Sequence, residues 1–194
     1  MKVGIVVFDK FLTSEVTAPI EIFAKAGKKG SVPFEPFLVA EEKRIIVSEE
    51  GLRIEPDYDF ANCPPIDVLV VPSGLDVEPL LANEKLIGFI KDRAENAKFV
   101  ASNCAGAFLL GKACLLEGRR VTTYIGGTED LAKRFPEAKV VDNEHIVTDG
   151  NMMSSIGELH TYDASLALVA KIAGKETADK TAEALYYFPW GKST

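Results

Sequence analysis

The stretch that decides the fold is Lys98-Phe-Val-Ala-Ser-Asn-Cys104-Ala-Gly-Ala-Phe-Leu-Leu-Gly111. Its first residues, 99–101, form a short apolar run that predicts a buried strand. Apolar residues at helical spacing from Phe108 to Leu116 predict a helix directly after it. Cys104 therefore lies at a sharp turn between a strand and a helix, among small neighbours. At such a turn a nucleophilic side chain projects above the end of the sheet, as the serine does in Gly-x-Ser-x-Gly enzymes.

The local sequence supports two interpretations of Cys104. The unpaired N–H groups and the positive dipole end at a helix N-terminus favour the thiolate, which predicts a lowered pKa and a reactive sulfur. Alternatively, a lone cysteine among apolar residues is a small buried hydrophobic group. Both interpretations stay open on this stretch alone.

Length and composition indicate one globular domain over residues 1–194, with 47% hydrophobic and 26% charged residues. The net charge of −7 and the lack of a long Lys/Arg run argue against nucleic acid or an anionic membrane as partner. The apolar runs are shorter than the roughly 20 residues that a membrane span needs. Three cysteines make no disulfide framework, and the N-terminus shows no signal-peptide pattern. We therefore expect a reducing, cytoplasmic location.

Strand and helix signals alternate along the chain. Strands are expected at residues 3–8, 33–40, 67–72, 99–101, 120–123, 139–141, 145–148 and 152–155. Helices are expected at residues 14–25, 84–96, after Cys104, and at 128–135, 161–173 and 175–185. The first of them has Thr13 or Ser14 as its expected N-cap and is expected to end before Gly27. A polar-aromatic tail over residues 186–194 follows the last helix. Segments 44–47 and 52–56 could pair as a small hairpin. This alternation predicts a mostly parallel sheet with helices on both faces.

Three strand ends carry chemically useful residues. The first strand leads through Asp9 to Glu15, the third ends at Ser73-Gly74, and the strand at 99–103 ends at Cys104. Ligands of open α/β sheets bind outside the carboxyl ends of the strands, at a topological switch point. We therefore expect these three strand ends to meet at one pocket.

Five segments of the chain resemble the ThiJ/PfpI superfamily, which is class I glutamine amidotransferase-like, and within it the isocyanide-hydratase-like group. They are residues 15–23, 60–74, 100–111, 115–124 and 147–155, and they run over nearly the full length. The resemblance implies a flavodoxin-like three-layer sandwich and a homodimer. It also implies a small-molecule substrate handled by a cysteine without a cofactor.

The resemblance makes Cys104 the nucleophile or redox centre and Glu15 its carboxylate partner. Two adjacent anions repel, so Glu15 is expected to have a raised pKa, to be protonated and hydrogen-bonded to the sulfur, and to donate or accept protons. Without the resemblance, Glu15 is a solvated residue in a first helical turn. The backbone N–H groups of Gly74, Leu75 and Ala105 are expected to bind an oxyanion or an oxidised cysteine; otherwise Gly74 and Leu75 belong to an ordinary turn.

The chain departs from the superfamily pattern at several positions. PfpI-type proteases have a histidine where this chain has Ala105, so we expect no peptidase activity. Isocyanide hydratases typically have aspartate in place of Glu15 and threonine in place of Ala105. Tyr124 replaces a frequent histidine, which brings the chain closer to small redox and glyoxalase-like members. Three residues are candidates for the pocket lining: Tyr124, Glu158 and His160. The alternative for Tyr124 is simple packing. The alternative for Glu158 and His160 is helix capping or surface exposure.

The remaining cysteines and histidine carry little signal. Cys63 and Cys114 are expected to be structural, with Cys114 on an apolar helix face, and His145 is expected at the surface. No His/Cys/Asp/Glu cluster has metal-ligand spacing. Two functions follow from the sequence: a cysteine enzyme acting on an isocyanide or an α-oxoaldehyde, or an oxidation-sensing, stress-protective protein whose Cys104 stops at sulfenic or sulfinic acid.

Overall fold

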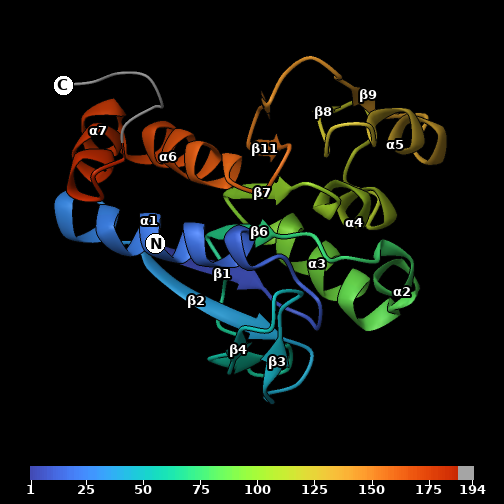
Figure 1. Cartoon of the computed structure of the whole chain (residues 1–194), viewed down its shortest axis with the longest axis horizontal. Helices are drawn as coiled ribbons and strands as arrows, with labels where there is room; N and C mark the ends of the chain where they lie inside the picture. The colour runs from blue at the N-terminus through green and yellow to red at the C-terminus, as the bar shows by residue number, and fades with distance from the viewer. Residues whose placement is uncertain (188–194) are drawn as a thin grey trace.

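The computed structural model describes residues 1–187 and contains a seven-stranded sheet between two layers of helices (Figure 1). In sheet order the strands are β10 (Ile146–Asp149), β11 (Met152–Ser155), β7 (Phe99–Asn103), β6 (Val68–Val71), β1 (Lys2–Val6), β2 (Glu35–Ala40) and β5 (Tyr58–Asp59). Neighbouring strands are parallel apart from β10, which pairs antiparallel with β11. The predicted flavodoxin-like α/β sandwich is confirmed.

The two helical layers enclose two separate hydrophobic cores. One layer contains α1 (Thr13–Lys29), α6 (His160–Ala173) and α7 (Lys175–Ala184), and the other contains α2 (Val77–Ala82), α3 (Glu84–Asn96) and α4 (Gly106–Lys112). Strand side chains alternate between the two faces of the sheet. In β6, Val68 and Val70 therefore face the core under α1 and α6, whereas Leu69 and Val71 face the core under α3 and α4.

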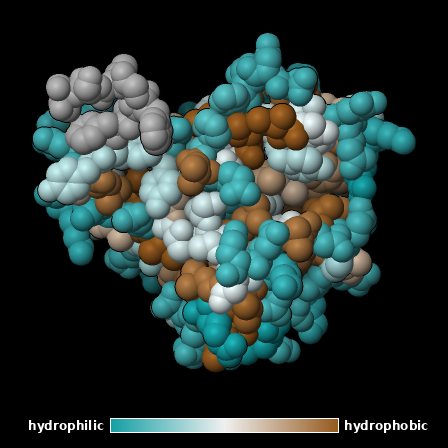
Figure 2. Space-filling model, viewed as in Figure 1, coloured by the Kyte–Doolittle hydropathy of each residue, from teal (hydrophilic) through white to brown (hydrophobic). Residues whose placement is uncertain are grey.

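Two small strand pairs lie outside the main sheet. The hairpin expected near residue 50 is present, with β3 (Ile46–Val47) antiparallel to β4 (Arg53–Ile54). Beyond α4, β8 (Arg120–Val121) pairs in parallel with β9 (Lys139–Val140), and α5 (Thr128–Arg134) connects them. No described helix is long and apolar enough to cross a membrane. In the space-filling view, hydrophobic residues form separate patches among hydrophilic ones (Figure 2).

The sheet reverses its strand order between β1 and β6. From β1 the chain passes to β2 on one side, and it later enters β6, β7 and β11 on the other side. Connections that leave adjacent strands in opposite directions open a crevice at their carboxyl ends. Glu15 follows β1, Ser73 follows β6 and Cys104 follows β7, so the switch point gathers all three.

Several predicted boundaries were wrong. Helix α1 has Leu12 as its N-cap and runs through Gly27 to Lys29. A Cβ on Gly27 would lie 2.7 Å from the Phe34 carbonyl oxygen, so the glycine lets the chain pack closely against the helix and does not end it. Helix α2 was missed because its six residues are too short a segment to establish a period, although Val77, Leu80 and Leu81 have helical spacing and pack against the core. Strand β5 was missed because it has two residues.

Cys114 is not on an apolar helix face. Helix α4 ends at Lys112, and Cys114 follows it as an exposed residue with a φ of 61°. Cys63 is buried, as expected. Most of the predicted C-terminal tail, from residue 188 to 194, lies outside the described residues.

Candidate active site

Cys104 occupies the sharp turn between β7 and α4. Its φ of 50° is left-handed, a conformation that costs a non-glycine residue of order 1–3 kcal/mol and needs support from its surroundings. The Cys104 N–H donates to the Ser155 carbonyl at 2.9 Å, and the Cys104 carbonyl accepts from the Thr123 hydroxyl at 2.8 Å. A Cβ on Gly106 would collide with the Val71 carbonyl oxygen, which explains the small residue after the turn.

Glu15 is fully buried at the start of α1, with an exposed fraction of 0%. Its Oε2 accepts a hydrogen bond from the Ser73 N–H at 2.7 Å, and its Oε1 accepts one from the Glu158 N–H at 3.1 Å. The carboxyl group thus joins α1 to the ends of β6 and β11. The alternative of a solvated residue in a first helical turn is wrong.

Gly157 lies between Cys104 and Glu15. It has a φ of 84°, and a Cβ at this position would collide with both the Glu15 Oε1 atom and the Cys104 Cβ atom. The two acids therefore face each other across a residue that has no side chain. Among the described residues, Glu15 makes no hydrogen bond to the Cys104 sulfur, so the direct bond expected from the sequence is absent from this conformation.

Burial raises the pKa of both acids of this site. Burial raises the pKa of Glu15 above its ordinary value of 4.5, although the N–H groups of Ser73 and Glu158 oppose the shift. Burial and the neighbouring Glu15 carboxylate raise the pKa of Cys104 to about 12. The lowered thiol pKa expected at a helix N-terminus is wrong, because α4 begins only at Gly106 and burial outweighs the Ala105 N–H. A thiol with a pKa of about 12 is protonated at neutral pH, so its ionisation needs a proton acceptor nearby.

The Ser73 hydroxyl is a site feature that the sequence analysis missed. Ser73 is 1% exposed, and its hydroxyl lowers the pKa of both Glu15 and Cys104. Its Oγ makes no hydrogen bond within the described part of the chain, so its O–H is free to donate to either acid. A serine directly after a buried strand is the sequence signal that indicates such a group.

A cavity of about 440 Å³ opens over Cys104. It is lined by Leu12, Glu49, Ser73, Gly74, Leu75, Val77, Cys104, Ala105, Tyr124 and Glu158. Of the three candidate lining residues, Tyr124 and Glu158 are in this set. His160 is not, because its ring lies 4.8 Å from that of His145 and its Nδ1 lies 3.7 Å from Asp163.

Two of the three expected backbone donors are available at the cavity. The Leu75 N–H already donates to the Lys10 carbonyl at 3.1 Å, so it cannot bind an oxyanion in this conformation. Within residues 1–187, the N–H groups of Gly74 and Ala105 make no hydrogen bond to a carbonyl. The Ala105 N–H instead interacts with the Cys104 sulfur. Gly74 and Ala105 therefore form the donor pair that this geometry offers.

The fold and these residues define an α/β protein with a cysteine at a strand–helix elbow and a buried glutamate beside it. The model of the DJ-1/PfpI family matches residues 1–171, and the chain belongs to that family.

Known relatives agree with this assignment over most of the chain. The isonitrile hydratase of Pseudomonas putida is 32% identical over 190 residues, which cover 97% of this chain and 79% of that protein. The deglycase PfpI of Pyrococcus furiosus is 30% identical over 156 residues, which cover 78% of this chain and 92% of that protein. The crystal structure of a ThiJ/PfpI family protein from Pseudomonas syringae has a TM-score of 0.87 at 23% identity and covers 100% of this chain and 77% of that one.

Replacing Ser73 by alanine should make Cys104 harder to ionise. A hydrogen bond to a charged group is worth about 1.5 kcal/mol, and one pKa unit corresponds to about 1.4 kcal/mol. We expect the rate of Cys104 alkylation by iodoacetamide at about pH 9, followed by peptide mapping, to fall about tenfold. Ser102→Ala is the matched control, since Ser102 is also a buried serine whose hydroxyl has no partner among the described residues. An unchanged rate, or an equal fall in the control, would contradict a role for the Ser73 hydroxyl.

Proposed function

We propose that this protein is a cysteine-dependent enzyme that acts on a small electrophile, by isonitrile hydration or by glyoxalase- or deglycase-like chemistry. The proposal rests on the position of Cys104 in the lining of an open cavity, with the buried Glu15 carboxyl group on the other side of Gly157. The similarity to an isonitrile hydratase and to a deglycase supports these two substrate classes.

In the isonitrile reaction, the Cys104 sulfur bonds to the terminal carbon of R–N≡C while the thiol proton passes to Glu15. Glu15 returns a proton to that carbon, which gives Cys–S–CH=N–R. Water then adds to the same carbon, and a proton reaches the nitrogen. The carbon–sulfur bond breaks, the sulfur regains a proton, and the formamide R–NH–CHO leaves. The sum is one isonitrile and one water, with no net oxidation.

An α-oxoaldehyde suits the same pair. The sulfur adds to the aldehyde carbon to give a hemithioacetal, and Glu15 moves a proton from that carbon to its neighbour, which gives a thioester. Water hydrolyses the thioester to a 2-hydroxy acid and releases the thiol. We assign the developing oxyanion to the N–H groups of Gly74 and Ala105. Tyr124 and Glu158, which line the same cavity, would contact the rest of the substrate.

A panel assay tests this proposal. We expect the wild-type chain to convert cyclohexyl isocyanide to its formamide or methylglyoxal to lactate, as measured by chromatography of the products. We expect no cleavage of a peptide substrate, because Ala105 stands where a peptidase would carry its histidine. Peptide cleavage, or no conversion of either electrophile, would contradict the proposal.

A second candidate function uses the same cysteine as an oxidation sensor. The Ala105 N–H interacts with the Cys104 sulfur, Gly74 lines the same open cavity, and N–H donors of this kind would stabilise a sulfinate. Under mild peroxide this function predicts sulfinic acid at Cys104 alone, as detected by peptide mass spectrometry. Equal oxidation of Cys63 and Cys114 would contradict it.

We also propose that the chain is a homodimer. Exposed apolar side chains lie at or next to the cavity, with exposed fractions of 62% for Leu75, 79% for Ile125 and 74% for Leu159. Apolar side chains grouped in this way favour a protein contact. Analytical ultracentrifugation should give twice the mass of one chain, and a mass of one chain would contradict the proposal.

A further inference from the structure

A second cavity, of about 420 Å³, lies at the carboxyl ends of β1 and β2. Its volume is within the range of small-molecule sites. Its inner wall is apolar and includes Phe8, Phe60, Leu80 and Leu86. Phe8 and Leu80 also pack against Gly74, because a Cβ on that glycine would lie 3.0 Å from each of them. These two side chains therefore separate this cavity from the one over Cys104.

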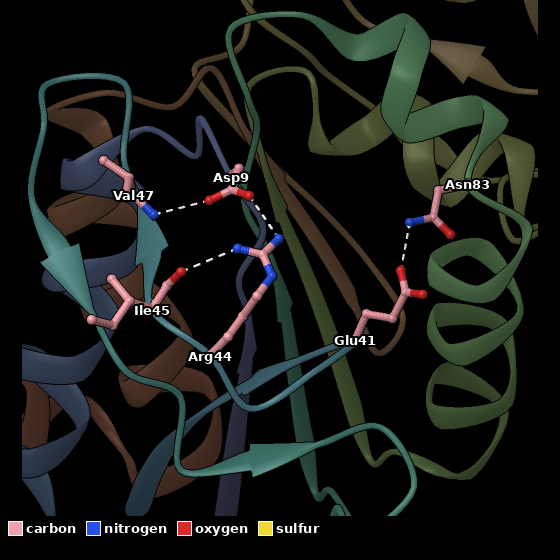
Figure 3. Close-up of polar contacts among 6 residues, drawn as sticks. All are labelled: Asp9, Glu41, Arg44, Ile45, Val47 and Asn83. Carbon is pink, nitrogen blue, oxygen red and sulfur yellow. Dashed lines mark hydrogen bonds and ion pairs between the residues drawn. The ribbon is translucent and has the colours of Figure 1, made fainter.

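The rim of the second cavity holds two carboxylates in fixed positions (Figure 3). On the α3 side, Glu41 accepts from the Asn83 side-chain amide at 2.9 Å, and Asn83 in turn caps α3 by accepting from the Leu86 N–H. On the hairpin side, Asp9 accepts from the Arg44 guanidinium at 2.7 Å and from the Val47 N–H at 3.1 Å. Both carboxylates are thus oriented before any ligand arrives.

The charge at this rim is negative. Asp9, Glu41 and Glu42 line the cavity, and Arg44 is its single cationic lining residue among those described. The Arg44 charge is already matched by Asp9, and a second guanidinium N–H donates to the Ile45 carbonyl. Hydrogen bonds from Lys85 and Asn83 lower the pKa of Glu41, so it is ionised at neutral pH. Lys85 offsets part of the Glu41 charge, and Glu42 remains without a described ion pair.

Aromatic rings face the same space. The Phe60 ring stacks on Phe89 at a centroid distance of 4.0 Å and an interplanar angle of 8°, which fixes its orientation. Phe60 and Phe8 are both half-buried and line the cavity. The face of an aromatic ring attracts a cation, and its apolar surface suits an aromatic or aliphatic body.

We propose that this second cavity binds a small organic cation with an apolar or aromatic body, such as an arylalkylamine. The ammonium group would lie between Glu41 and Glu42, and the body would lie against Phe60 and Phe8. This site is separate from the Cys104 cavity, so binding does not depend on the proposed chemistry.

Titrations of the ¹⁵N-labelled full chain with three matched probes test the proposal. The probes are 2-phenylethylamine, the neutral 2-phenylethanol and the anionic 3-phenylpropionate. We expect the amine to shift the Asn83 side-chain amide signal in a saturable way and to bind about fivefold more tightly than the alcohol, since an ion pair at a partly exposed site is worth up to about 1 kcal/mol. We expect the anion to bind more weakly than the alcohol.

Variants test whether the negative charge of Glu41 contributes to amine binding. Glu41→Gln keeps an oxygen that can accept from Asn83, and it should weaken amine binding about fivefold while leaving alcohol binding unchanged. Phe60→Leu should weaken both probes. Glu95→Gln makes the same charge change at an exposed position on α3, away from the cavity, and should change neither, as should Cys104→Ala. Equal binding of amine and alcohol, no saturation at Asn83, or an equal loss in Glu95→Gln would overturn the proposal.

Discussion

Cys104→Ala is expected to lower kcat/KM for the electrophile that the wild type converts by roughly 10⁴-fold or more. Removal of the nucleophile from a catalytic constellation costs factors of this size, because the remaining groups cannot form the covalent intermediate. The measurement is the rate of formamide or lactate formation at equal protein concentrations. Alanine leaves the turn residue small, so the elbow should remain folded.

The other two cysteines provide controls for that experiment. Cys63 is buried and Cys114 is exposed, and neither lines the Cys104 cavity. We expect Cys63→Ala and Cys114→Ala to keep turnover within a few-fold of the wild type. If Cys104→Ala retained a tenth or more of the wild-type rate, covalent catalysis at this residue would be ruled out.

Glu15→Gln is expected to lower turnover by about 10²- to 10⁴-fold, the range for the loss of a general acid–base group. In the wild type, burial and the Glu15 carboxylate raise the pKa of Cys104 to about 12. The variant has no charge at this position, so the pKa of Cys104 should fall. Alkylation of Cys104 at a given alkaline pH should therefore be faster in the variant than in the wild type.

The matched control for this variant is Glu49→Gln. Glu49 lines the same cavity, but its side chain makes no hydrogen bond to the Cys104–Glu15 pair. We expect Glu49→Gln to leave the rate of Cys104 alkylation unchanged. An unchanged rate in Glu15→Gln as well would show that the Glu15 carboxylate does not raise the pKa of Cys104.

The pKa shift of Glu15 has a consequence for stability. The raised pKa of Glu15 means that the folded state binds more protons than the unfolded state at pH values above about 4.5. The free energy of unfolding should therefore fall as the pH rises from 4.5 through the folded-state pKa. Glu15→Gln lacks this dependence. Urea denaturation should therefore show that the free energy of unfolding of the variant, relative to that of the wild type, is higher at pH 7 than at pH 4.5.

The sequence predicted those elements whose local signals agree with their tertiary contacts. Helix α3 was expected at residues 84–96 and lies at Glu84–Asn96, because Asn83 caps it and its apolar residues follow a helical spacing. The predicted helix over residues 14–25 is shorter than α1, because a glycine typically ends a helix, whereas Gly27 lies inside α1 and makes a close contact with Phe34. A local pattern cannot distinguish these two uses of glycine.

The site was less accessible to sequence reasoning than the fold. Glu15, Ser73 and Cys104 follow the carboxyl ends of parallel strands, and the alternation of elements indicates that these strands are parallel. The order of the strands, which brings the three residues together, came from the structure. The complete burial of Glu15, the raised pKa of Cys104 and the occupied Leu75 N–H depend on contacts between distant segments. No local pattern encodes such contacts, so these features needed the structure.

Parallel measurement of Cys104 alkylation and turnover tests covalent catalysis by Cys104. Samples of the wild-type chain are treated with limiting iodoacetamide, mapped by peptide mass spectrometry and assayed with the electrophile that the chain converts. We expect residual turnover to fall in direct proportion to the fraction of Cys104 modified, whatever happens at Cys63 and Cys114. Full turnover in a sample whose Cys104 is completely alkylated would contradict covalent catalysis at this residue.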